Sequence, residues 1–172
     1  MAALLTLARR AIEAAARRQP PPAPDLPGGV RAGAFVSLYR RGELRGCMGQ
    51  LDADEPVERV IVRMAVAASR EDPRFAAVEV HELAELDIEV SVLTPLARAH
   101  ASELTVGRDG VVVRRGNRQG VLLPQVATEY GWDRDRLLAE VCRKAGLPAD
   151  AWRDERTELF LFQAQVITQA PT

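Results

Sequence analysis

Residues 86 to 93 read LDIEVSVL, the stretch that decides the fold class more than any other in the chain. Apolar side chains alternate in it with Asp87, Glu89 and Ser91. This period of two predicts a β-strand with one face in the core and one face in solvent. The apolar members are Leu86, Ile88, Val90 and Val92.

Upstream of this strand, residues 56 to 70 read PVERVIVRMAVAASR and predict an amphipathic helix. Apolar residues recur there at i, i+3, i+4, i+7, i+8 and i+11, which places them in one stripe. Pro56 suits the first turn, and either Asp54 or Glu55 can cap the start. Asp72-Pro73 ends the helix, because a residue before proline is pushed out of the helical region.

The N-terminal third is expected to hold one helix and one hairpin. Residues 2 to 18 have the Arg-rich look of a transit peptide, but Glu13 and a helical apolar spacing favour an ordinary packed helix. The Pro- and Gly-rich residues 19 to 33 form a linker. Residues 34 to 40 and 44 to 50 then read as two strands joined by a tight turn.

The C-terminal half is expected to begin with a second hairpin, residues 111 to 115 and 119 to 123 around Gly116-Asn117. Pro124 opens a short helix that stops at Gly131. Asp133 caps the next helix. Residues 157 to 167 read as one long last strand.

This order of elements is not a regular βαβ alternation, so the expected class is α+β, with a mixed or antiparallel sheet and flanking helices. A chain of 172 residues fits one domain. We expect a larger subdomain from the two ends of the chain and a smaller lobe at residues 106 to 150.

Composition limits the classes of function. The net charge of -1 argues against wholesale binding to nucleic acid or to an anionic membrane. Residues 1 to 50 hold 8 Arg against 3 acidic residues, so only this third offers a basic face. No apolar run approaches the ~20 residues that span a membrane. Two unclustered cysteines indicate a reduced, cytoplasmic setting and no structural zinc.

The segment Leu44 to Gly49 is the first candidate for chemistry, because two glycines bracket Cys47 in a predicted strand. Glycine within a strand marks a bulge or a close approach to the backbone. A thiol there, near Arg45, can have a lowered pKa and act as a nucleophile. The alternative is that Cys47 is a small buried residue in a strand that needs glycines for packing.

The other candidates are weaker. Asp72 and Arg74 follow the clearest helix and can place a carboxylate and a guanidinium at the edge of a cleft, or simply form a local ion pair. Cys142 lies on the apolar face of a capped helix and is expected to be buried and inert. His81 and His100 are expected at the surface, and no phosphate-binding loop is present.

Several ordered motifs resemble those of one family, the AMMECR-one family. Arg45-Gly46-Cys47-Met48-Gly49 resembles its hallmark RGCIG, with Met in place of Ile. The resemblance runs from about Leu4 to Ile167, and its one notable departure is Ala76-Ala77, where the family often has two prolines. The remaining matches are Asp72 to Phe75 (DxRF), Glu89 to Pro95 (EVSVLTP), Leu122 to Ala127 (LLPQVA), Gly131 to Asp133 (GWD) and Lys144 to Leu147 (KAGL).

The resemblance implies an intracellular α+β protein of a larger and a smaller subdomain. It also implies an association with a Memo-like protein and a radical-SAM protein, as protein A of the AmmeMemoRadiSam system. An enzymatic role in nucleotide or RNA modification has been proposed for such systems. In this chain, the resemblance assigns that role to Arg45, Gly46, Cys47 and Gly49. No established reaction comes with the family.

Two hypotheses of different classes follow. In the first, Cys47 and Arg45 are catalytic in a cleft, and the substrate-binding residues are Gly46, Gly49, Asp72 and Arg74. No metal or cofactor is predicted, and the substrate is nucleotide-like or otherwise anionic. In the second, the chain is a non-catalytic binding or adaptor module in which this segment is structural. The first hypothesis predicts a solvent-reachable and unusually reactive Cys47 thiol.

Overall fold

The computed structural model describes residues 2–24 and 29–169 and divides them into two compact units. Unit 1 extends to Leu93 and takes up the chain again at Gln165, whereas unit 2 is Thr94–Ala164. Unit 2 includes the range 106 to 150, for which a smaller lobe is expected. Each unit places helices against a four-stranded sheet, so the expected α+β class with two subdomains is confirmed.

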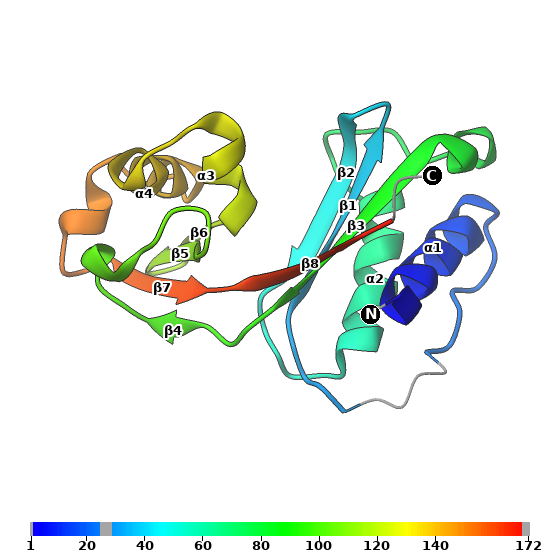
Figure 1. The fold of residues 1–172 in the computed structure, drawn as a ribbon, viewed down its shortest axis with the longest axis horizontal. Helices are drawn as coiled ribbons and strands as arrows, with labels where there is room; N and C mark the ends of the chain where they lie inside the picture. The colour runs from blue at the N-terminus through cyan, green and yellow to red at the C-terminus, as the bar shows by residue number, and fades with distance from the viewer. Residues whose placement is uncertain (1, 25–28, 170–172) are drawn as a thin grey trace. The chain divides into compact units, whose positions relative to one another are not determined.

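The sheet of unit 1 has the strand order β2-β1-β3-β8. Its members are β1 (Ala34–Arg40), β2 (Glu43–Gln50), β3 (Leu86–Leu93) and β8 (Ala164–Thr168). Strand β1 is antiparallel to both β2 and β3, so β2 lies at an edge. Helices α1 (Ala2–Ala16) and α2 (Val57–Arg70) pack side by side against this sheet (Figure 1).

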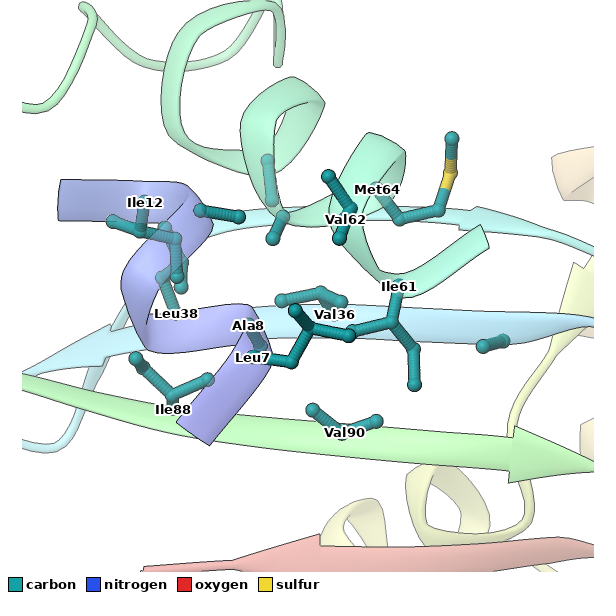
Figure 2. Close-up of a cluster of buried hydrophobic side chains, with 14 of the residues drawn as sticks. Leu7, Ala8, Ile12, Val36, Leu38, Ile61, Val62, Met64, Ile88 and Val90 are labelled. Atoms are coloured by element: carbon teal, nitrogen blue, oxygen red, sulfur yellow. The ribbon is translucent and has the colours of Figure 1, made fainter. Parts of the chain in front are cut away.

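The core of unit 1 lies between the two helices and the sheet. Figure 2 shows α1 and α2 directing apolar side chains toward β1 and β3, whose Val36, Leu38 and Val90 are fully buried. Every residue of the stripe predicted for residues 56 to 70 is buried, which confirms that prediction. Burial of one large apolar side chain contributes about 1.5–3 kcal/mol, so the stripe holds α2 firmly in place.

The prediction for the start of α2 is wrong. Pro56 is the N-cap residue and no side chain caps it, so neither Asp54 nor Glu55 has that role. The amide of Val57 instead donates to the carbonyl of Val30 at 2.9 Å. Backbone from the linker thus satisfies one of the first amides of the helix, which a search for capping side chains does not detect.

Strand β3 matches residues 86 to 93, but its second face is less solvated than predicted. Asp87 is exposed and Glu89 is half-buried, whereas Ser91 is only 1% exposed. The Ser91 hydroxyl has no hydrogen-bond partner among the described residues. Alternation therefore located the strand and its core face correctly but misjudged the surroundings of Ser91.

Unit 2 has the strand order β4-β7-β5-β6. The expected hairpin is β5 and β6, and the expected helices are α3, which stops at Gly131 in the left-handed conformation, and α4, which Asp133 caps. The elements are β4 (Ala97–Arg98), β5 (Gly110–Arg115), β6 (Arg118–Leu122), β7 (Glu158–Phe162), α3 (Pro124–Tyr130) and α4 (Arg134–Lys144). Strand β4 and the short 3-10 helices η1 (Val80–Glu85), η2 (Ala101–Glu103) and η3 (Ala151–Arg153) were not predicted.

The expected long strand at residues 157 to 167 is two strands in two sheets. Strand β7 belongs to unit 2 and β8 to the sheet of unit 1, and Gln163 separates them. The Gln163 amide donates to the Thr94 hydroxyl at 2.8 Å, and the Thr94 amide donates to the Gln163 carbonyl at 2.9 Å. These bonds fix the break between the strands, which falls where the continuous apolar run 159–162 is followed by Gln163.

Candidate functional site

A β-bulge positions Cys47 on the edge strand β2. The register pairs Leu38 with Gly46 and Tyr39 with Leu44, so Arg45 is the extra residue. Cys47 lies directly opposite Ser37, whose hydroxyl donates a hydrogen bond to the Cys47 sulfur at 3.2 Å. Cys47 is half-buried, whereas Ser37 is only 4% exposed. The bulge and the buried hydroxyl therefore place the sulfur at a defined position on the sheet.

A carboxylate from outside the sheet holds the same residue by its backbone. The Cys47 amide donates to Oδ2 of Asp72 at 2.9 Å. Asp72 also accepts from Arg74 three times: from Nε at 2.9 Å, from Nη2 at 2.7 Å and from the backbone amide at 3.1 Å. Two of the five guanidinium N–H groups are thus committed to Asp72. We call these three residues the Cys47–Asp72–Arg74 cluster.

The electrostatics of this cluster follow from its contacts. The Arg74 hydrogen bonds, together with the Cys47 amide, hold the pKa of Asp72 well below its usual range, although burial opposes the shift. The pKa of Arg74 is raised, first by the bond to Asp72 and to a lesser degree by the nearby Cys47 sulfur. The Asp72 side chain is 2% exposed and that of Arg74 is 55% exposed. A fixed, buried anion thus holds a cation that is open to solvent.

Arg45, predicted to be catalytic, binds elsewhere. Its guanidinium donates to both oxygens of Glu82 at 2.9 Å and to the carbonyl of Ala76 at 2.8 Å. These bonds lower the pKa of buried Glu82 to about 2. The Arg45 side chain therefore holds η1 and the loop after Phe75 in place through Glu82 and Ala76.

The two glycines that bracket Cys47 have packing roles. A Cβ on Gly46 would lie 2.2 Å from the Ala68 carbonyl oxygen of α2, so only glycine permits this approach of strand and helix. A Cβ on Gly49 would lie 2.1 Å from the Phe35 ring, which covers that position. Arg45 is thus bound to Glu82, and Gly46 and Gly49 are required by the close packing of β2, which leaves Cys47 as the candidate for chemistry in this segment.

The histidines lie on exposed segments. His81 pairs with Glu79 at 3.2 Å, and His100 is the N-cap residue that precedes η2. Within residues 2–24 and 29–169, no group of three or more His, Cys, Asp or Glu is placed to hold a metal ion. In the same residues, no helix is long and apolar enough to cross a bilayer.

Sequence reasoning missed Ser37 and Glu82. Ser37 is a polar residue in the middle of an apolar strand. This position becomes informative only when the strand register is known, because the register places Ser37 opposite Cys47. Glu82 lies on a short 3-10 helix without hydrophobic periodicity, and its partner Arg45 is 37 residues away. Local sequence carries no signal for that pair.

Fold and cluster together define a two-unit α+β protein with an Asp-anchored cysteine on an edge strand. The chain matches the AMMECR1 family over residues 5–167 and belongs to that family, the AMMECR-one family that its motifs resemble.

Solved and curated relatives extend over nearly the whole chain. A protein of Methanothermobacter thermautotrophicus is 42% identical over 175 residues, which cover 95% of this chain and 91% of that protein. A protein of Pyrococcus furiosus is 40% identical and covers 96% and 86%. The crystal structure of an uncharacterized protein of Pyrococcus horikoshii has a TM-score of 0.91 at 39% identity and covers 95% and 88%.

Proposed function

We propose that this AMMECR1-family chain is a cysteine-dependent enzyme that uses Cys47 on an anionic, nucleotide-like substrate. The observation that supports this most is that buried Asp72 binds both the Cys47 amide and the Arg74 guanidinium. One carboxylate thereby fixes the position of a solvent-exposed guanidinium relative to the residue that carries the half-buried thiol. Such preorganised charge beside a nucleophile is what a site for an anion requires.

Each residue of the cluster has a separate role in the proposal. The thiolate of Cys47 is the nucleophile or the acid–base group, and the Ser37 hydroxyl stabilises it by donating to the sulfur. Arg74 binds the carboxylate or phosphate of the substrate through the N–H groups that Asp72 does not use. Asp72 is a positioning residue. Memo-like and radical-SAM proteins act as partners in a cytoplasmic setting.

A second candidate is a non-catalytic binding module. The packing roles of Arg45, Gly46 and Gly49 favour it, because most of the motif is needed to shape β2. An apolar groove of about 410 Å³ beside Met48 and Met64 offers a surface for it. In that case the Cys47 thiol is inert.

Alkylation kinetics separate the two candidates. We would measure the rate of iodoacetamide labelling of Cys47 against pH by mass spectrometry, in the wild-type chain and in Arg74→Gln. If Arg74 stabilises the thiolate, Arg74→Gln should slow labelling at pH 7 by about 3- to 10-fold, since one pKa unit is a tenfold change in thiolate. Saturating adenosine monophosphate should protect Cys47 in the wild-type chain alone.

Arg156→Gln is the matched control. Arg156 binds Asp154 as Arg74 binds Asp72, but the cysteine amide that donates to Asp72 has no counterpart among the hydrogen bonds of Asp154 in the described residues. Its labelling profile should equal that of the wild-type chain. If Cys47 resists labelling until the protein unfolds, or if Arg74→Gln changes nothing, the binding-module candidate is the better one.

A further inference from the structure

A cavity of about 660 Å³ lies within unit 2. Residues of β4, η2, η3 and β7 form its wall, and none of them belongs to the Cys47–Asp72–Arg74 cluster. Its volume falls in the range of roughly 300–1,000 Å³ that is typical of sites for small organic molecules.

Acidic side chains outnumber cationic ones in the lining of this cavity. The carboxylates are Glu103, Asp154, Glu155 and Glu158, and the guanidiniums are Arg98 and Arg153. Arg98 is already paired with Glu158 at 3.1 Å. Within residues 2–24 and 29–169, the Glu155 side chain forms no hydrogen bond or ion pair. Asp154 is neutralised by Arg115 and Arg156. The lining carboxylates without an ion pair among the described residues are therefore Glu103 and Glu155, against the single weakly paired cation Arg153, and this surplus of negative charge favours a cationic ligand.

An aromatic ring, that of Trp152, also lines the cavity, and the side chain of Arg153 lies over it. The Arg153 guanidinium lies 4.4 Å from the centre of the Trp152 ring. Its ion pair with Asp135 is long, at 3.7 Å, and both side chains are more than half exposed, so the pair contributes little. A ligand cation can thus replace Arg153 over Trp152, where cation–π attraction favours it.

A metal ion fits these residues less well than an organic cation. No described group of three or more metal-ligating side chains converges, in the cavity or elsewhere in residues 2–24 and 29–169. The carboxylates come instead from separate elements: Glu103 from η2, Glu158 from β7, and Asp154 and Glu155 from the segment after η3. Dispersed carboxylates beside one aromatic ring match a flexible chain with several ammonium groups.

We propose that this cavity binds an organic polycation of the polyamine class. One ammonium group takes the place of Arg153 over Trp152, and another pairs with Glu155. The site is separate from the function proposed for Cys47 and does not depend on it.

The two tryptophans of the chain allow a direct test. In the full-length Trp132→Phe variant, Trp152 is the sole tryptophan, so its fluorescence reports on the cavity. Titration with spermidine should give a saturable change, which MgCl₂ at equal ionic strength should not reproduce. Adding Arg153→Ala should tighten binding by about 3-fold or more, because the competing cation is removed.

Glu155→Gln should weaken binding by about 3- to 10-fold, whereas the control Glu129→Gln, on the exposed side of α3, should have no effect. Calorimetric titration of the wild-type chain with spermidine provides a second measurement should Trp132→Phe fold poorly. The proposal is overturned if spermidine gives no saturable signal, if Mg²⁺ gives the same one, or if Glu155→Gln and Glu129→Gln behave alike.

Discussion

The chain contains the same local arrangement twice, once in each unit. Asp72-Pro73-Arg74 and Asp154-Glu155-Arg156 both place an arginine two residues after an aspartate. In both, the arginine donates its backbone amide, Nε and Nη2 to the carboxylate. In both, the pKa of the aspartate is lowered, first by the arginine. The Asp-x-Arg spacing is therefore sufficient to form the ion pair.

The surroundings of the two pairs differ. The Asp72 side chain is 2% exposed and accepts a hydrogen bond from the Cys47 amide of an edge strand. The Asp154 side chain is 31% exposed, and its additional partner is the Arg115 side chain. One carboxylate is thus buried and bound to the Cys47 backbone, whereas the other is partly exposed at the wall of the unit 2 cavity. The difference arises from what the fold brings to the carboxylate.

The packing that brings β2 to Asp72 should be the most sensitive feature. Gly46→Ala places a Cβ 2.2 Å from the Ala68 carbonyl oxygen, and neither backbone can yield easily. We expect a loss of about 3 kcal/mol or more in the free energy of unfolding, measured by urea denaturation.

Two glycine variants serve as controls for this packing argument. Gly49→Ala should cost less, because its obstacle is the Phe35 side chain. Gly29→Ala meets nothing within 4 Å and should stay within about 0.5 kcal/mol of the wild-type chain. Equal losses at Gly46 and Gly29 would contradict the close approach of β2 and α2.

The two aspartates provide the next test. Asp72→Asn removes a buried anion that accepts four hydrogen bonds, so we expect a loss of about 2–3 kcal/mol. Asp154→Asn should cost clearly less, because that pair is more open to solvent and is screened. Urea denaturation of both variants in low and in 1 M salt measures the contrast. If Asp154→Asn is the more damaging change, the comparison between the two pairs is wrong.

Acid should weaken the buried Arg45–Glu82 ion pair of unit 1, and with it the free energy of unfolding, in a defined range of pH. The pKa of Glu82 is lowered from 4.5 to about 2, first by the hydrogen bonds from Arg45. A lowered carboxyl pKa contributes stability above pH 4.5, and this contribution is lost as the pH falls toward 2. A shift of this size corresponds to about 3 kcal/mol.

The destabilisation that Glu82→Gln causes at pH 6 should therefore shrink as the pH approaches 3. Urea denaturation at pH 6, 4 and 3 checks this, with Glu129→Gln as the exposed control. A loss that is independent of pH would show that the Arg45–Glu82 contact does not supply this stability.

The two cysteines should give the smallest change in stability but a clear contrast. Cys142 is fully buried on α4, and burial raises the pKa of its thiol. Cys142→Ser should cost about 1–2 kcal/mol, whereas half-buried Cys47→Ser should cost about 0.5 kcal/mol or less. Iodoacetamide should label Cys142 only when the protein unfolds. Rapid labelling of Cys142 in the native protein would contradict its placement in the core.

The elements that sequence patterns located correctly are those with a strong local period. Residues 86 to 93 and the apolar stripe of 56 to 70 are found as predicted, because alternation and helical spacing report directly on a buried face. The capping of α4 by Asp133 is equally local. The start of α2 and the break in the last predicted strand were misjudged because they depend on Val30 and Thr94, residues distant in the sequence.

For this protein, the sequence alone determined the α+β class, the family, and the main helices and hairpins. Each depends on residues a few positions apart or on ordered motifs. Only the tertiary structure decided that Arg45 binds Glu82 and that Asp72 binds the Cys47 amide, 25 residues away. The physical reason is that a guanidinium or a carboxylate binds whichever partner the packed backbone brings within about 3 Å, and packing is set by the whole chain.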